Sequence, residues 1–171
     1  MKKIITIVFL ITTLIPINAQ TYTEESEVEN VLIGKKIDPN ILASFGITTF
    51  INPKNTEISG NSVFLAQVGE LNEVSIYTNT NSSEINIAQN GNFNKTDLNY
   101  TANTAVSELV QYGNYNLIRD FVNAPYEDIS LNLIQDGNYL NFQREGVNQL
   151  TKSLKFRQTE ASPSIIIRSI N

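Results

Sequence analysis

From residue 61 onward, apolar and polar residues alternate along short segments of the chain. The apolar residues that recur at every second position are Val63 and Leu65, Ile85 and Ile87, Leu109, and Leu131 and Leu133. A period of two predicts a strand with one face buried and the other exposed. The alternation resumes a few residues later, for example at Val74 and Ile76. Each unit is therefore predicted to be a strand, a tight turn and a second strand.

The motif Gln-x-Gly-x-x-Asn stands at each predicted tight turn. Its glutamines are Gln67, Gln89, Gln111 and Gln135, its glycines Gly69, Gly91, Gly113 and Gly137, and its asparagines Asn72, Asn94 and Asn116. In the fourth copy, Leu140 takes the asparagine position and Asn141 follows it. Copies at a fixed spacing of about 22 residues are typical of stacked repeat units. Glycine permits the positive φ or the close backbone approach that a tight bend requires.

A fifth, degenerate copy is predicted at Gln158, with Glu160 and Pro163 at the glycine and asparagine positions. Proline lacks an N–H group, which suggests a unit modified for a terminal place. Two extra residues between the third and fourth copies are expected in an outer turn, within residues 123–126. The predicted fold is all-β: a β-solenoid of strand-turn-strand repeats, with a period of about 22 residues, four clear repeats and a degenerate fifth.

The inward parity of the motif glutamines and asparagines requires a physical explanation. A buried amide costs free energy unless it is hydrogen-bonded, but like amides stacked about 4.8 Å apart can donate to one neighbour and accept from the other. We therefore predict stacking ladders of the motif glutamines and of the motif asparagines, whose end rungs stay open to another molecule. The alternative, ordinary turn residues of a closed β-sandwich, is disfavoured because the pattern recurs in register.

The beginning of the chain follows a different pattern. Lys2 and Lys3, an apolar run over residues 4–15 and Ala19 predict a signal peptide over residues 1–19 and a secreted protein. The apolar run is shorter than the ~20 residues that span a bilayer, so the mature protein is not expected to span a membrane.

Residues 20–58 contain no copy of the repeat and open with four closely spaced glutamates. We expect an N-terminal leader or cap, partly disordered, with a short strand over residues 47–51. Residues 59–171 form the predicted solenoid.

Composition narrows the possible functions. The net charge is −5, and removal of the signal peptide leaves 10 basic and 17 acidic residues, a net charge of −7. Phosphate contacts need clustered lysine and arginine, so nucleic acid is not expected as a partner. The chain contains no histidine and no cysteine, which removes the commonest general base and thiol nucleophile. We expect no enzymatic activity, catalytic residue, cofactor or metal, and we interpret Glu84 and Glu108 as a solvated edge.

The repeat resembles that of the curlins, the amyloid subunits of bacterial curli fibres, over about residues 60–170. The curlin repeat reads roughly Ser-x5-Gln-x-Gly-x-x-Asn-x5-Gln, and this chain matches its first Gln, its Gly and its Asn. Only Ser83 matches the leading Ser, and the second Gln is replaced by Thr78, Tyr100, Val122 and Gly146. The resemblance implies export through a curli-type outer-membrane pore with accessory factors, and a cell-surface fibre made of this chain and other curlin-like subunits.

Two charged residues, Asp120 and Arg144, fall on the inward parity of second strands, where burial without a partner is costly. They could pair across neighbouring rungs, but we expect instead a one-residue shift of the strand that exposes them. We interpret both as gatekeepers that slow aggregation. With the missing second Gln, they favour a minor or nucleating subunit over a major one.

The sequence is compatible with two classes of function. The first is a structural subunit or nucleator of curli-like fibres that support adhesion and biofilm matrix. The second is a monomeric cell-surface adhesin that binds glycans or another surface protein. Its candidate contacts are the outward aromatic residues Tyr77, Tyr112, Tyr115 and Tyr139, which could equally stack on one another between rungs. A third class, a β-helical polysaccharide lyase, lacks a visible catalytic group.

Overall fold

The computed structural model describes residues 38–50 and 52–169. All of the described residues belong to one compact unit. The predicted signal peptide, the glutamate-rich stretch and Ile51 of the predicted short strand lie outside the described residues.

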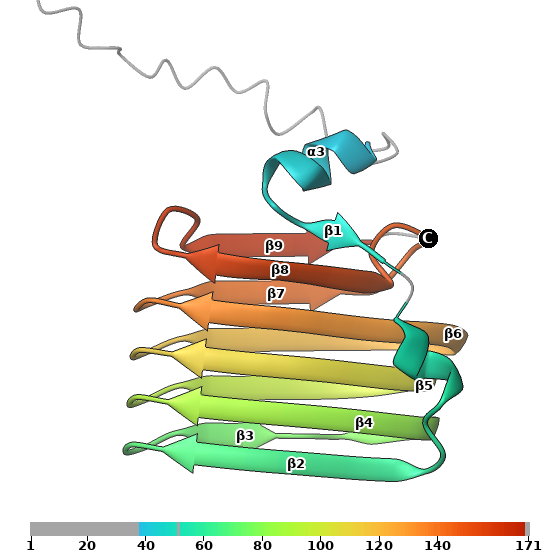
Figure 1. Cartoon of the computed structure of the whole chain (residues 1–171), viewed down its shortest axis with the longest axis horizontal. Helices are drawn as coiled ribbons and strands as arrows, with labels where there is room; N and C mark the ends of the chain where they lie inside the picture. Colours follow the sequence, from blue (N-terminus) through green and yellow to red (C-terminus); the bar gives the residue numbers. More distant parts are fainter. Residues whose placement is uncertain (1–37, 51, 170–171) are drawn as a thin grey trace, which may run out of the picture. The chain divides into compact units, whose positions relative to one another are not determined.

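Residues 61–169 form a β-solenoid of five coils, as the sequence predicts (Figure 1). Its strands are β2 (Asn61–Val68), β3 (Glu73–Ser75), β4 (Thr78–Asn90), β5 (Lys95–Tyr112), β6 (Leu117–Asp136), β7 (Asn141–Glu145), β8 (Ser153–Thr159) and β9 (Ser164–Arg168). Each coil contributes one strand segment to each of two walls, and β4, β5 and β6 pass from one wall to the other through the outer bend. The coils are residues 61–82, 83–104, 105–128, 129–151 and 152–169, and the degenerate fifth repeat forms the last of them.

Neighbouring coils pair in parallel, and each residue lies opposite its counterpart in the repeat. Gln67 pairs with Gln89, for example, and Gln135 pairs with Gln158. The one shift of register in the pairing of β5 with β6 falls between Ala102 and Thr104. There the outer bend of the third coil accommodates the two-residue insertion, as predicted.

The tight bends depend on backbone conformations that most residues avoid. The four motif glycines have φ between 102° and 146°. A Cβ atom on Gly91 would lie 1.9 Å from the carbonyl oxygen of Gly113, so the coils approach one another too closely for any side chain there. The residue before the asparagine position in each of the first four repeats has a left-handed backbone and is not glycine. These residues are Leu71, Phe93, Tyr115 and Tyr139, with φ of 56–58°. The structure thus holds a strained residue in each of the first four tight bends.

Residues 38–50 cover the last coil of the solenoid, at the end of the stack opposite β2. Helix α3 (Pro39–Ser44) is followed by β1 (Thr48–Thr49), which pairs antiparallel with β8 of the last coil. The short helix η1 (Pro53–Thr56) then leads to β2 at the other end of the stack (Figure 1). Leu42 and Ile47 are buried and join the same hydrophobic cluster as Leu154 of β8. None of the helices within the described residues is long and apolar enough to cross a membrane.

Candidate assembly surface and amide ladders

The motif glutamines form a continuous ladder inside the solenoid. Each Nε2 donates to the Oε1 of the next glutamine toward the C-terminus, at 2.6 Å from Gln67 to Gln89, 2.8 Å to Gln111 and 2.9 Å to Gln135. Gln135 extends the ladder to Gln158 at 2.9 Å. Because every bond points the same way, the ladder has a free acceptor, Oε1 of Gln67, at its first rung, whereas Nε2 of Gln158 at its last rung donates to backbone carbonyls. The second proton of Nε2 binds backbone, as when Gln135 donates to the carbonyl of Leu117.

The motif asparagines link one bend to the next through two kinds of bond. Nδ2 of Asn94 donates to the carbonyl of Gly113 at 2.8 Å, and Oδ1 of Asn94 accepts the backbone N–H of Asn116 at 3.1 Å. In the fourth copy, Leu140 occupies the asparagine position and donates its backbone N–H to Oδ1 of Asn116 at 3.0 Å. Asn141 lies one position later, where its Nδ2 donates to the hydroxyl of Ser164 at 3.4 Å, so the file of inward asparagines ends at the third coil.

A further file of asparagines, which the sequence interpretation missed, runs along the outside of the bends. Asn92, Asn114 and Asn138 directly follow the motif glycines, and the Oδ1 of each accepts a backbone N–H from the coil before it at 2.8–2.9 Å. Their recurrence one position after the glycine in three copies is the signal that identifies them.

Aromatic rings stack along the same bends. Phe93 lies 4.7 Å from Tyr115, and Tyr115 lies 5.0 Å from Tyr139, measured between ring centroids, with interplanar angles of 3° and 2°. Stacking of this kind stabilises neighbouring rungs. It also occupies the ring faces with which Tyr115 would otherwise contact a flat ligand.

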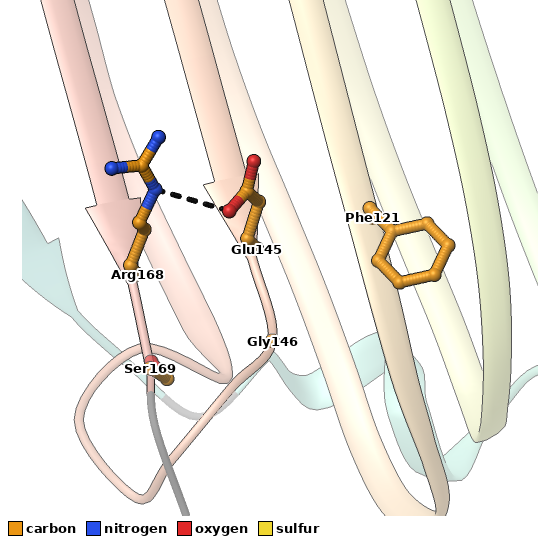
Figure 2. Close-up of a pocket in the computed structure, with 5 residues that line it drawn as sticks. All are labelled: Phe121, Glu145, Gly146, Arg168 and Ser169. Atoms are coloured by element: carbon orange, nitrogen blue, oxygen red, sulfur yellow. Dashed lines mark hydrogen bonds and ion pairs between the residues drawn. The ribbon is translucent and has the colours of Figure 1, made fainter.

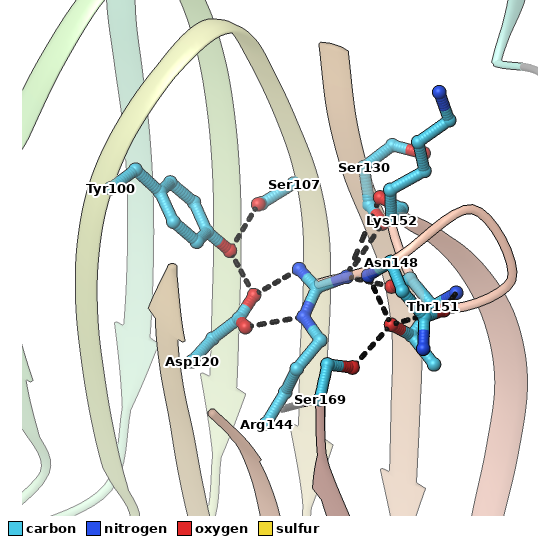
Figure 3. A network of polar contacts seen from close by, with 9 residues as sticks. All are labelled: Tyr100, Ser107, Asp120, Ser130, Arg144, Asn148, Thr151, Lys152 and Ser169. Carbon is cyan, nitrogen blue, oxygen red and sulfur yellow. Dashed lines mark hydrogen bonds and ion pairs between the residues drawn. The ribbon is translucent and has the colours of Figure 1, made fainter. Parts of the chain in front are cut away.

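Asp120 and Arg144 pair inside the solenoid, so the expected strand shift that exposes them is wrong. The two residues lie opposite each other in the register of β6 and β7, and both side chains are fully buried. The guanidinium binds both carboxylate oxygens at 2.6 Å, and the carboxylate also accepts a bond from the Tyr100 hydroxyl (Figure 3). Nη1 of Arg144 donates to the carbonyl of Thr151 at 2.8 Å. Bidentate geometry and these additional partners compensate for the loss of hydration that the shift would have avoided.

Burial and charge shift the pKa values in this network. Burial raises the pKa of Tyr100 well above its ordinary value of 10.0, and the negative charge of Asp120 raises it further. Burial lowers the pKa of the Arg144 guanidinium, but the charge of Asp120 and the bonds to it outweigh burial, so that pKa is raised. The network therefore holds a neutral phenol and a permanent cation at neutral pH.

Glu84 and Glu108 lie one rung apart on the surface, and Lys54 of η1 bridges them. The ammonium group lies 3.1 Å from Glu84 and 2.7 Å from Glu108. Hydrogen bonds to Glu108 and Glu84 raise the pKa of Lys54, and the bond from Lys54 lowers that of Glu84. The bridge ties η1 to the wall of the solenoid. The two glutamates thus share a cation, which the sequence interpretation did not foresee.

A shallow depression lies where the outer bends of the last coils meet (Figure 2). Phe121, Glu145, Gly146, Arg168 and Ser169 line it. Arg168 donates to Glu145 across the rung at 3.1 Å. In this exposed ion pair, the two charged groups bind each other. Among the residues that line the depression, no acid and base point toward a shared position where a substrate could react.

The two ends of the stack differ in burial. In the first coil, the inward residues Val63 and Leu65 are each 49% exposed, and every residue of β2 is exposed. In the last coil, their counterparts Leu154 and Phe156 are 0% and 5% exposed, with β1 paired alongside. Among the described residues, nothing covers the outer edge of β2. The first coil is thus an open parallel strand edge with an apolar inner face.

Fold and site together define a β-solenoid repeat protein with a continuous interior glutamine ladder and, among the described residues, one uncovered end. Comparison with protein-family models, curated proteins and solved structures finds no match to this chain.

Proposed function

We propose that this protein is a secreted subunit or nucleator of a curli-like amyloid fibre that supports cell adhesion and biofilm matrix. The observation that supports this function best is the open first coil, in which the amide of Gln67 and the apolar side chains of Val63 and Leu65 are exposed. A further coil of the same kind would bury Val63 and Leu65 and continue the ladder from Gln67. By the resemblance, its partners are itself, other curlin-like subunits and a curli-type outer-membrane pore.

Fibre formation and seeding by purified residues 20–171 test this function. We expect either dye-positive fibres with a meridional repeat near 4.7 Å or a shortened lag when the folded protein is added to a curlin-type repeat chain. A protein that stays monomeric and does not seed would end the proposal.

Substitutions in the glutamine ladder test the same function through the kinetics of assembly and seeding. Replacing Gln89 and Gln111 with Leu removes two central rungs and leaves Nε2 of Gln67 and Oε1 of Gln135 without their glutamine partners. We expect slower assembly or seeding. Glu84→Gln, which changes a surface charge at similar side-chain size, serves as the control and should leave the kinetics unchanged or faster.

A monomeric adhesin is the alternative function. Tyr77, Tyr112 and Tyr139 are 63%, 46% and 70% exposed and could meet a sugar ring or a partner surface. The ring stack of Phe93, Tyr115 and Tyr139 already uses faces that such binding needs. Binding of the monomer to a glycan array would favour the adhesin.

A further inference from the structure

The two ends of the solenoid are chemically different, and we infer that only the first coil accepts another coil. We further infer that its partner is a different repeat chain whose last coil keeps the motif Gln-x-Gly-x-x-Asn. This inference rests on the proposed function and specifies which end of the protein joins the fibre. The joint continues the coil–coil interface that is already repeated within the chain.

At the tight bend, an interior coil makes three bonds with the motif glutamine and asparagine side chains of the coil before it. In the third coil, Oε1 of Gln111 accepts at 2.8 Å, the carbonyl of Gly113 accepts at 2.8 Å, and the N–H of Asn116 donates at 3.1 Å. The partner groups come from Gln89 and Asn94 of the second coil.

In the first coil, the equivalent groups are Oε1 of Gln67, the carbonyl of Gly69 and the N–H of Asn72. No described residue precedes them in the stack.

These open groups specify the chemistry of the coil that fits them. It must supply a glutamine Nε2, an asparagine Nδ2 and an asparagine Oδ1 at the spacing of the motif. It must also have glycine between them, because a Cβ at that position in each of the first three coils lies about 2 Å from the next carbonyl. A basic residue after the asparagine would face Glu73, as Lys95 does from the other side at 2.9 Å.

The last coil of this chain cannot supply that chemistry. Nε2 of Gln158 donates to the carbonyls of Asn141 and Ser162 at 3.0 and 2.9 Å, so both of its protons are used within the chain. Glu160 stands where glycine is needed, and Pro163 stands where the asparagine amide is needed.

The cap adds a second obstacle at the same end, because β1 pairs with the edge of β8 where a further coil would pair, and Leu42 and Ile47 join the hydrophobic cluster that contains Leu154. A second copy of this chain therefore cannot continue the stack from its last coil, and a chain with an intact terminal motif can.

The test compares residues 20–171 with a variant that carries Glu160→Gly, Pro163→Asn, Thr48→Pro and Thr49→Pro. The changes restore the motif in the last coil and remove β1, so this two-ended variant presents compatible surfaces at both ends. We expect the wild-type protein alone to sediment as a monomer and the variant to form head-to-tail chains of at least ten-fold higher mean mass. Wild type added at one part in ten should shorten those chains at least two-fold, because each wild-type molecule ends a stack.

Single substitutions in β2 identify the face that joins. Each substitution is made in the otherwise wild-type protein, which is then added to the two-ended variant. Leu65→Lys places a charge on the inner face of the first coil, so the added protein should no longer shorten the chains. Phe64→Lys lies on the outer face of the same strand, and the protein that carries it should shorten the chains to within two-fold of the effect of wild type. A second probe, three tandem copies of residues 83–104, supplies an intact terminal motif without any change to this chain. Wild type should bind it, with at least ten-fold weaker binding for Leu65→Lys.

Three results would overturn the inference: wild type that assembles alone as fast as the variant, Leu65→Lys that shortens chains as well as wild type, or no binding to the tandem probe. The first two leave the proposed fibre function intact. The proposed function fails separately if wild type neither forms fibres nor seeds a curlin-type chain.

Discussion

At the residue scale, the repeat is maintained by positions that tolerate no other side chain. The first three motif glycines combine a positive φ with close approach to the backbone of the next coil, and Gly137 lies against the side chain of Glu160 instead. From the second coil to the fourth, the motif glutamines are buried, and each bonds to the glutamines of the coils before and after it. Because the bonds of one rung depend on its neighbours, a change at a single rung affects the whole file.

Gly91→Ala tests the close approach of the coils. The new Cβ would lie 1.9 Å from the carbonyl oxygen of Gly113, so the bend must open. We expect a loss of about 3 kcal/mol or more in the free energy of unfolding, measured by urea titration of residues 20–171. Gly46→Ala is the matched control: φ there is +70°, nothing lies within 4 Å, and a cost of about 1–2 kcal/mol from backbone strain alone is expected. Equal losses for the two variants would contradict this account.

The raised pKa of Tyr100 predicts that the free energy of unfolding falls at alkaline pH. Its folded-state pKa is raised above the ordinary 10.0, so the folded protein holds this proton more tightly than the unfolded chain does. The stabilisation is present below pH 10 and is lost as the pH rises above 10, with a slope of up to about 1.4 kcal/mol per pH unit. Urea titrations from pH 8 to 11.5 measure the slope. Tyr100→Phe should remove this part of it, whatever its effect on stability at pH 8, and an unchanged slope would count against the buried network.

At the scale of elements, the segment α3–β1 acts as a cap on the last coil. The cap is small: β1 contributes two residues, Thr48 and Thr49, and the hydroxyl of Thr48 donates to the carbonyl of Lys155 at 3.0 Å. Burial of Leu42 and Ile47 provides the apolar contact that keeps it in place. The cap and the degenerate motif therefore modify the same end.

Ile47→Asp should release the cap without unfolding the coils. An aspartate at this position, where the side chain is 3% exposed, loses its hydration without gaining a partner. We expect amide exchange in β8 to accelerate at least ten-fold while exchange in β5 stays unchanged, measured by hydrogen–deuterium exchange. Ile41→Asp on α3 is the control, because that side chain is 49% exposed and should have little effect. Equal acceleration in β5 would show that the cap is part of the cooperative core.

At the scale of the whole described unit, the solenoid is a stack in which each coil contacts only its neighbours. Stability in such a stack is close to a sum of coil and interface contributions, so an end coil with one neighbour is the weakest. The last coil gains β1 as a second neighbour, whereas the first coil gains none among the described residues. The asymmetry that defines the assembly surface is thus also an asymmetry of stability.

Native-state hydrogen exchange should show this gradient. We expect protection to rise from the amides of β2 to those of β5, because opening of the first coil breaks one interface and opening of a central coil breaks two. Addition of a partner chain with an intact terminal motif should raise protection in β2 selectively. Uniform protection along the stack would indicate a single cooperative unit instead.

The sequence by itself determined the parallel coils, the bends and the file of glutamines. Period-two alternation and the 22-residue spacing are local signals, and they place Gln67, Gln89, Gln111 and Gln135 at one register position whatever the rest of the chain does. The outer asparagines carried a similar signal, directly after the glycines.

Only the tertiary structure decided how distant segments meet. The pairing of Asp120 with Arg144 depends on register between strands 24 residues apart and on the position of Tyr100, which no alternation pattern specifies. The choice of the last coil as the place for β1 depends on a contact between residues 107 positions apart. Such contacts are set by which apolar surface remains uncovered once the coils have stacked, and that surface exists only in the folded chain.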